Sequence, residues 1–422
     1  MSQSTTENKN DDVHHSLKGP HVPGEDNHES VAQRFEALIE STKDDHESHV
    51  GVSEVGGLKE DKSSLDKISG YFKKLGCSII PNSQELDDDF VYYKMGNYVV
   101  NRNASPPNDR FFESMPIYVR IGMHLLFYSS KKKSLLRFGR IEDLLKKMSE
   151  REGEIYNDSS KPEEVQAFIQ NFVKTYSIET KDLEEQDLTK YKTRNEFFYR
   201  KLKPDVRPIP EPENTKLIGS AADCRLMVFN NAEDAKKIWI KGRQFSVKEL
   251  INKKGEETNK LSEGSSIAIY RLAPADYHRY HHPVGASKVI SQTHSGEEYY
   301  TVNPDAVNEN FDVFTANTRD ISMLEWTPIP DQQVIPFAFV SIGALLVGSN
   351  VFTNATKGSS YKRGEEMGYF AYGGSTCIAI FPPEAKVKWD DDLLTNSNKG
   401  VSNFTTLTCF IFHILTTFFL SF

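Results

Sequence analysis

Short apolar runs separated by glycine, proline and asparagine dominate the chain after Tyr191, and this texture most constrains the fold. The runs are rich in Val, Ile, Tyr and Phe and are interrupted too often for long helices. They are residues 236–240, 266–272, 287–290, 299–302, 337–347 and 376–381. Such runs predict strands joined by tight turns, so this half of the chain is expected to form a β-rich domain.

The preceding region has a mainly helical pattern. An apolar stretch, residues 115–128, is followed by further apolar side chains at roughly helical spacing. Between the two lie Lys131, Lys132 and Lys133. Basic residues beside an apolar stripe suit a helix on anionic lipid, so these lysines are candidate membrane-binding residues; a core-facing helix with solvated lysines fits equally well. A second helix is expected from Pro162, because proline and the acids after it favour a first helical turn.

The first 69 residues are strongly acidic and polar. They hold fifteen acids and seven bases, which accounts for −8 of the chain's net charge of −9. They also hold six of its twelve histidines. A stretch this polar cannot bury enough surface to offset its ordering entropy, so a disordered acidic tail is expected over residues 1–68. The acidic balance of the chain argues against nucleic acid as a partner, because a nucleic-acid-binding surface would show a basic excess.

Targeting and redox signals point to the inside of the cell. No positively charged start followed by an apolar stretch marks a secretory signal, and the acidic, arginine-poor beginning disfavours a mitochondrial presequence. The four cysteines lack paired spacing and are interpreted as reduced thiols. An intracellular protein that is not secreted is therefore expected.

The last segment of the chain is unusual in composition. Residues 405–422 contain no Lys, Arg, Asp or Glu and comprise eleven apolar residues, six Thr or Ser and one His. Eighteen residues is the lower limit for a bilayer span, and six hydroxyl groups weaken that interpretation. An atypical hydrophobic tail is expected over residues 400–422, either as a membrane anchor or as an abnormal end of the gene product.

Histidines cluster in the run from Arg271 to Pro283. His278 and His281 are three residues apart, as in a short helical turn after Pro274, which would place both imidazoles on one side of a loop. No Cys or Glu stands at a spacing that would complete a zinc site, so no metal is assigned. Histidine carries protons near neutral pH without special tuning, which favours acid–base chemistry in this segment.

Two further segments could carry chemistry. Gly373 and Gly374 precede Ser375, so the backbone can adopt a strained turn just before an apolar strand. Asp223 is a lone acid between small residues. Taken alone, each segment is more typical of a turn or a strand end than of a catalytic group.

In their order along the chain, these segments resemble the phosphatidylserine decarboxylase family, pyruvoyl-dependent enzymes that make phosphatidylethanolamine. The similarity covers residues 115–398. Its blocks are residues 195–204, 222–225, 239–242, 271–283, 300–304, 317–319, 342–349 and 363–376. The chain departs from the family pattern at Gly373, where many members carry Leu, and at Cys224, where many carry Gly. Its tail stands where the family continues with a further strand, which would leave a sheet edge unpaired.

The resemblance implies a self-cleaving proenzyme. The hydroxyl of Ser375 would attack the Gly374 carbonyl to form an ester, and elimination followed by hydrolysis would leave a pyruvoyl group on residue 375. This group is the covalent pyruvate cofactor of the family. Glycine at position 374 leaves the carbonyl open to attack. His281 and Asp223 match the family's base and its orienting acid, and His278 matches the position linked to decarboxylation, as a donor to the carboxylate or to Cα.

The resemblance also implies an organisation and partners. An α+β fold is expected, with a disordered acidic tail (1–68), a mainly helical membrane-docking region (69–190), a β-rich catalytic domain (191–399) and the hydrophobic tail (400–422). Self-cleavage between residues 374 and 375 would give a β chain (1–374) and an α chain (375–422). The substrate would be phosphatidylserine in a membrane, and a homodimer is a further expectation. A membrane-associated location follows, with an endomembrane favoured over mitochondria.

Three other functions stay open from the residues alone. A pyruvoyl-dependent decarboxylase of a soluble amino acid such as tryptophan would share the C-terminal half, although residues 271–281 are closer to the lipid enzymes. A lipid-binding pseudoenzyme would remain uncut. A serine hydrolase is disfavoured, because the Gly-x-Ser-x-Gly elbow is absent around Ser375.

Overall fold

The computed structural model describes a set of ranges that belong to one compact unit of the chain. They are residues 96–102, 104, 109–114, 153–238, 246–252, 259–273, 275–296, 317–329, 334–343, 350–353, 356–371 and 375–414. The predicted acidic tail and the three candidate lysines lie outside these ranges. The described part is rich in strands with few helices, which is compatible with the expected α+β class. A helical N-terminal region stays a prediction.

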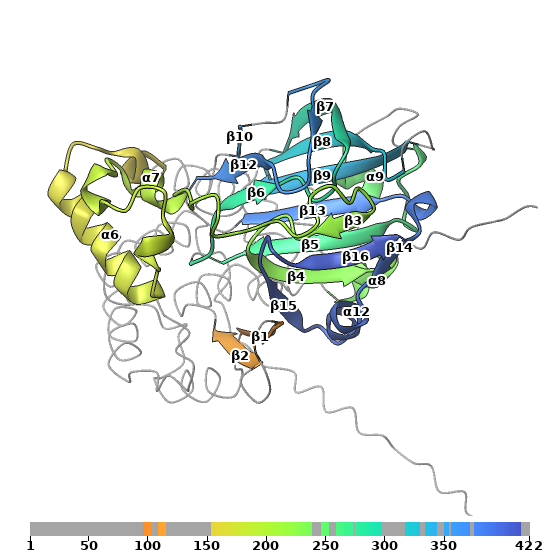
Figure 1. The fold of residues 1–422 in the computed structure, drawn as a ribbon, viewed down its shortest axis with the longest axis horizontal. Helices are drawn as coiled ribbons and strands as arrows, with labels where there is room; N and C mark the ends of the chain where they lie inside the picture. Colours follow the sequence, from red (N-terminus) through yellow and green to blue (C-terminus); the bar gives the residue numbers. More distant parts are fainter. Residues whose placement is uncertain are drawn as a thin grey trace, which may run out of the picture. The chain divides into compact units, whose positions relative to one another are not determined.

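Three sheets contain the described strands (Figure 1). The largest has the order β11 (Ser360–Tyr361), β7 (Ser287–Ser295), β8 (Arg319–Trp326), β9 (Ile335–Gly343), β13 (Ser375–Phe381), β5 (Ser266–Leu272), β4 (Cys224–Phe229), β15 (Ser402–Thr405), β1 (Gly96–Asn101) and β2 (Arg110–Ser114). The second is β10 (Asn350–Phe352), β12 (Glu366–Phe370) and β6 (Arg279–His281), and the third is β14 (Val387–Trp389), β16 (Phe410–Ile414) and β3 (Leu217–Gly219). Among the described pairs, β1 and β15 run parallel and the others run antiparallel.

The helices partly confirm the sequence-based expectations. They are α6 (Pro162–Tyr176), α7 (Arg194–Phe198), α8 (Ala232–Ile238), α9 (Val247–Leu250) and α12 (Asp391–Asn398), with the short turns η2 (Thr180–Asp182), η3 (Leu188–Lys190) and η4 (Pro383–Ala385). The helix expected from Pro162 is confirmed as α6, which packs on α7 through Phe172 and Phe197, whose ring centroids lie 5.8 Å apart. The strand expected at 236–240 is wrong over its described residues, which end α8.

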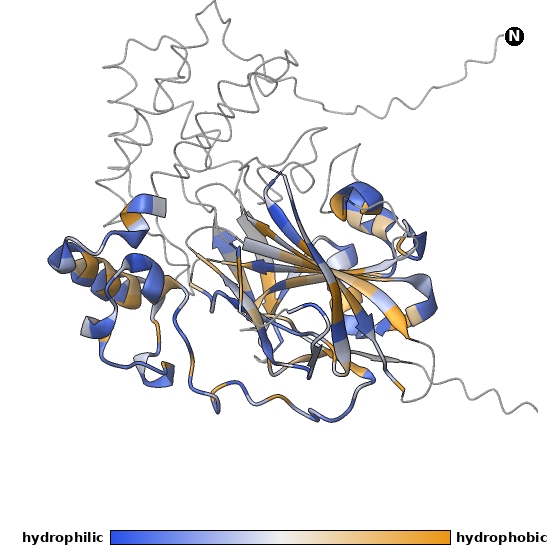
Figure 2. Ribbon diagram, turned by 90° about the horizontal axis from the view of Figure 1, so that it is seen from above, coloured by the Kyte–Doolittle hydropathy of each residue, from blue (hydrophilic) through white to orange (hydrophobic). Residues whose placement is uncertain are grey.

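The central strands carry the main core. The apolar runs 266–272 and 376–381 are confirmed as β5 and β13, and β13 is buried along its whole length. Figure 2 shows hydrophobic stretches along several strands of the described sheets. Tyr280 of β6 stacks on Phe339 of β9, with ring centroids 5.8 Å apart, so the β6 sheet covers one face of the large sheet. Strands covered on both faces have continuous apolar sequences, which explains why these runs were recognisable.

Part of the predicted hydrophobic tail is built into the sheets. β15 lies between β4 and β1, and β16 lies between β14 and β3. The described residues of this segment therefore fill sheet positions instead of leaving an edge unpaired. Residues 415–422 lie outside the described ranges. Among the described helices, none has both the length and the apolar character needed to cross a membrane.

Candidate active site

Antiparallel pairing gathers the candidate residues at one end of four neighbouring strands. Ser375 begins β13 and lies opposite Leu272 at the end of β5 and opposite Gly343 at the end of β9. Asp223 immediately precedes β4, the neighbour of β5 on its other side. Gly374 lies outside the described residues. The chain therefore brings an acid from one segment and a serine more than a hundred residues later to the same edge of the sheet.

His281 ends the short strand β6 (Arg279–His281) and His278 immediately precedes it, so the helical turn expected to hold both histidines is wrong. β6 pairs with β12, and the carbonyl of His278 accepts a hydrogen bond from the amide of Phe370, with 3.0 Å between N and O. The amide of His281 donates to the carbonyl of Ala221 at 2.8 Å. Neighbouring strands thus satisfy backbone groups that a lone turn would leave without a partner. The pairing also carries His278 to the strand that leads into Ser375.

Both candidate histidines have the same hydrogen-bonding arrangement. Nδ1 of His278 lies 2.9 Å from the carbonyl oxygen of Asp276, and Nδ1 of His281 lies 2.9 Å from that of Gly364. A carbonyl can only accept, so Nδ1 carries the proton in each neutral ring and the lone pair is on Nε2. Both Nε2 atoms are buried and have no hydrogen-bond partner among the described residues.

Burial keeps these imidazoles neutral. Desolvation, with the nearby charge of Arg200, lowers the pKa of His278 to about 3. Desolvation also lowers the pKa of His281, against the hydrogen bond to Gly364. A neutral imidazole with a free Nε2 lone pair can accept a proton, and because burial penalises the protonated ring, each side chain would return that proton readily.

Ser375 presents a buried hydroxyl group. Its side chain is 0% exposed, and its Oγ has no hydrogen-bond partner within the described part of the chain. A buried hydroxyl without a partner costs free energy, and such groups in native proteins call for an explanation such as reactivity. The next residue, Thr376, also has a buried hydroxyl without a described partner.

Asp223 is held by an arginine instead of by a histidine. Arg207 contacts Oδ2 of Asp223 through Nη2 at 2.7 Å and through Nε at 2.9 Å, and the amide of Leu407 donates to Oδ1 at 3.0 Å. The structure places no hydrogen bond between Asp223 and His281, because the Nδ1 proton of His281 is used by Gly364. The carboxylate acts on His281 through its charge, which favours the protonated ring.

Metal and thiol chemistry have little support at this site. Within the described ranges, no three His, Cys, Asp or Glu side chains form a group that could hold a metal ion. Cys224, next to Asp223, contacts Ser220 and Thr405. Desolvation by burial raises the pKa of Cys224 to about 12, so it is a neutral thiol that does not compete with the acid.

Sequence reasoning missed the residues that hold these groups in place. Gly364 and Arg225 lie inside the family-like blocks, which were the available signal. Arg207 and Glu113 lie outside every block. Arg207 is 16 positions from its partner Asp223, and Glu113 is 112 positions from Arg225, so no local pattern could reveal either contact.

Comparisons with known proteins identify the family. Residues 194–402 match the family model described as phosphatidylserine decarboxylase. The chain is 40% identical over 290 residues to phosphatidylserine decarboxylase proenzyme 2 of Komagataella phaffii, covering 68% of this chain and 27% of that protein. It is 36% identical over 301 residues to the protein of the same name from Saccharomyces cerevisiae, covering 71% of this chain and 25% of that protein.

A bacterial relative is covered more completely. The chain is 37% identical over 242 residues to the phosphatidylserine decarboxylase proenzyme of Fusobacterium nucleatum, covering 57% of this chain and 76% of that protein. By contrast, the chain spans only about a quarter of the length of the two fungal relatives. The match to three quarters of the bacterial protein, together with the ordered site at the strand ends, shows that this chain belongs to the phosphatidylserine decarboxylase family.

Proposed function

We propose that this chain is a phosphatidylserine decarboxylase proenzyme. It cuts itself between Gly374 and Ser375, and the resulting β and α chains convert phosphatidylserine to phosphatidylethanolamine and CO₂. The observation that carries the proposal is the buried, unpartnered hydroxyl of Ser375 at the start of β13, at the sheet end where two neutral histidines also lack Nε2 partners among the described residues.

The residues present fit a covalent pyruvoyl group formed from Ser375. β13 is hydrogen-bonded to β5 on one side and to β9 on the other, so a new chain end at residue 375 stays anchored in the sheet. Such a group would supply a carbonyl for the substrate amine and an electron sink for Cα when CO₂ departs. The buried position of residue 375 would exclude the water that competes with the amine for this carbonyl.

His281 is the proposed base for self-cleavage. Its neutral Nε2 takes the proton of the Ser375 hydroxyl, which turns a weak nucleophile into one able to attack the Gly374 carbonyl. Asp223 stabilises the protonated ring through its charge. In this arrangement Gly364, and not the acid, orients the imidazole.

His278 is the proposed proton carrier for decarboxylation. With Nδ1 bound to the Asp276 carbonyl, the ring first accepts a proton on Nε2 before it can donate one. The substrate ammonium group must lose a proton to become a nucleophile, and Cα must gain one after CO₂ leaves. One imidazole that takes the first proton and returns it to Cα meets both needs.

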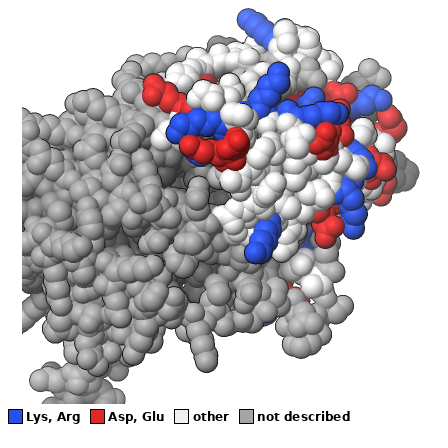
Figure 3. All heavy atoms as spheres, turned by 90° about the vertical axis from the view of Figure 1, so that its left-hand side faces the viewer, with Lys and Arg blue, Asp and Glu red and all other residues white. Residues whose placement is uncertain are grey.

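Membrane docking and dimer formation belong to the same proposal. Figure 3 shows acidic and basic side chains interleaved on the pictured face of the described residues, without a broad area of one sign. The apolar, lysine-flanked sequence around Lys131, Lys132 and Lys133 is the proposed contact with anionic lipid, at an endomembrane. Flotation of Lys→Glu variants with anionic vesicles tests it, and native mass spectrometry tests the homodimer.

Intact mass spectrometry of the expressed protein tests self-cleavage. Two chains are expected, the α chain starting with a hydroxylamine-sensitive carbonyl, whereas Ser375→Ala should stay whole. Ser322→Ala is the matched control, because Ser322 is also a buried serine without a described partner but lies on β8, separated from β13 by β9. That variant should cut normally. A whole wild-type chain, or cleavage in Ser375→Ala, would overturn the assignment.

The substrate is tested by release of labelled CO₂. Phosphatidylserine in detergent micelles should be decarboxylated, and free tryptophan should not. Release from tryptophan alone would identify an enzyme for a soluble amino acid. A cut chain that is inactive on both compounds would refute the proposed activity while leaving self-cleavage intact.

A further inference from the structure

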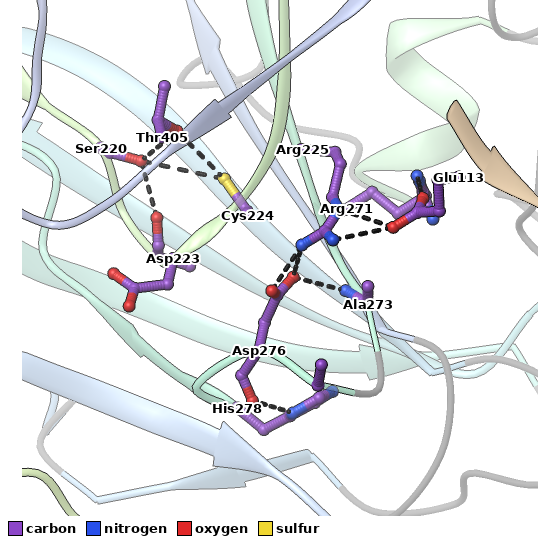
Figure 4. Close-up of polar contacts among 12 residues, drawn as sticks. Glu113, Ser220, Asp223, Cys224, Arg225, Arg271, Ala273, Asp276, His278 and Thr405 are labelled. Carbon is purple, nitrogen blue, oxygen red and sulfur yellow. Dashed lines mark hydrogen bonds and ion pairs between the residues drawn. The ribbon is translucent and has the colours of Figure 1, made fainter. Parts of the chain in front are cut away.

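A carboxylate on the β1–β2 hairpin reaches two arginines of the central sheet. Glu113 of β2 contacts Arg271 and lies 2.8 Å from Nε of Arg225 (Figure 4). Arg225 and Arg271 are direct cross-strand neighbours on β4 and β5, so their like charges would repel without a shared anion. Burial would raise the pKa of Glu113, but the charges of Arg271 and Arg225 outweigh it and lower the pKa to about 2. Glu113 is therefore ionised at neutral pH.

Arg225 also binds the side chain of Asp276. Nη1 of Arg225 contacts both carboxylate oxygens of Asp276, and Oδ2 of Asp276 also accepts the amide of Ala273 at 2.7 Å. Arg225 and Asp276 are both buried. Burial lowers the pKa of Arg225, but Asp276 and Glu113 outweigh this effect and raise it, so the guanidinium stays charged. With Arg271, two acids and two bases form a cluster without net charge.

The backbone of Asp276 connects this cluster to the candidate histidine. Its carbonyl oxygen is the partner of Nδ1 of His278 at 2.9 Å and also accepts Nη2 of Arg200 at 3.2 Å. Figure 4 shows the sequence of contacts from Glu113 through Arg225 and Asp276 to His278. Asp276 thus binds Arg225 through its side chain and His278 through its carbonyl, so a displacement of the whole residue would also move the carbonyl that keeps the proton on Nδ1.

We propose that Glu113 and Arg225 are positioning residues that hold Asp276 so that its carbonyl fixes the tautomer of His278, with Nε2 left as the acceptor. The inference rests on the proposed function for the step it affects. Glu113 precedes the residues matched by the family model, 194–402, so the hairpin upstream of that domain completes the site. Fixing one tautomer keeps every ring in the form that can take a proton.

The test compares Glu113→Gln with Arg102→Gln in the full, self-cleaved enzyme. Glu113→Gln keeps the size of the side chain but removes the charge that binds Arg225. Arg102 ties the same hairpin to the N-terminus of α12 through Asp390 and Asp392, without touching the cluster, so its variant controls for loosening of the hairpin. Arg225→Lys is a second variant, because lysine keeps the charge but cannot hold Glu113 and Asp276 together.

Two readouts separate positioning from stability. Glu113→Gln should lower kcat per pyruvoyl group roughly tenfold with little change in KM. In ¹⁵N-histidine-labelled protein, the His278 signals should show a mixture of tautomers in place of one. Arg225→Lys should give the same two results as Glu113→Gln. Arg102→Gln should resemble the wild type in both measurements.

A single His278 tautomer in Glu113→Gln, together with an unchanged kcat, would overturn the inference. An equal loss of kcat in Arg102→Gln would also overturn it. The failure of the proposed function would look different. Wild-type enzyme would then release no CO₂ from phosphatidylserine, whereas the tautomer comparison would still decide whether Glu113 positions His278.

Discussion

At the scale of single residues, the buried histidines His278 and His281 make the protein sensitive to mild acid. The unfolded chain binds a proton on His278 near the ordinary pKa of 6.5, whereas the folded ring does so only near a pKa of about 3. Stability from this residue is therefore complete above pH 6.5 and is lost as pH falls from 6.5 towards 3. His281, whose pKa is also lowered by burial, acts in the same direction.

The lowered pKa of His278 predicts how steeply the free energy of unfolding falls as the pH falls. In uncut Ser375→Ala protein, we expect His278 alone to account for a loss of about 2 kcal/mol between pH 7 and pH 5. The window stays above pH 4.5, where Glu113 would begin to add its own loss. Adding His278→Gln should flatten the slope in denaturant titrations. Ser322→Ala is the control, because it changes a buried side chain that carries no titratable group. Equal slopes with and without His278 would contradict this account.

At the scale of elements, the turn before β12 orients His281. Gly364 has a φ of +82°, and a Cβ there would lie 2.3 Å from Cγ1 of Ile209. In Gly364→Ala, either the Ile209 side chain or the turn whose carbonyl holds Nδ1 of His281 has to shift, and a displacement of this carbonyl by about 1 Å can slow a reaction by about a hundredfold. We expect slower self-cleavage, measured as the disappearance of the uncut band after expression at low temperature.

Gly358→Ala separates displacement from backbone strain. Gly358 has a similar φ of +88°, but a Cβ there would meet no atom within 4 Å. This variant should lose stability through the same strained conformation, about 1 kcal/mol, and should cut at the normal rate. Equal slowing in both variants would show that the position of the Gly364 carbonyl is not what matters.

The elements also show which features the sequence could predict. β5, β13 and α6 were recognisable because continuous burial and helical periodicity leave a local pattern. Residues 236–238 were misassigned because a short apolar run fits either structure. The helix is decided upstream, where the Asn231 side chain accepts the amide of Asp234 at 2.9 Å. β6 was misassigned because its conformation depends on β12, more than eighty residues away.

The candidate site also contains some residues that the sequence could indicate and others that it could not. Sequence similarity pointed to Asp223, His278, His281 and Ser375, and the fold brings them to one end of the sheet. The groups that orient the histidines are backbone carbonyls, which carry no sequence signal. Arg225 binds the side chain of Asp276 and also Glu113, which is 112 positions away, so only the folded chain reveals these contacts.

At the scale of the whole molecule, cleavage should not separate the two chains. The proposed α chain contributes β13 between β5 and β9, β15 between β4 and β1, and β16 next to β3, so its strands interleave with those of the β chain. Across this boundary Phe381 stacks on Phe337 with ring centroids 5.2 Å apart, and the indole of Trp389 donates to the Phe229 carbonyl at 2.9 Å. Pulling β13 out would expose a fully buried strand and leave two sheet edges unpaired.

Native mass spectrometry of the cut protein should therefore show one particle that contains both chains, while a denaturing gel shows two bands. The uncut Ser375→Ala variant should give the same native particle, because cutting the bond before β13 removes none of the strand pairs on either side. Urea should release the α chain only at the concentrations that unfold the sheet itself. Unfolding of the sheet is measured by the fluorescence of Trp326 and Trp389, which are both buried in the core. An α chain that leaves in neutral buffer would mean that the pairing of β13 and β15 does not hold the molecule together, and that residue 375 is not anchored by its neighbours.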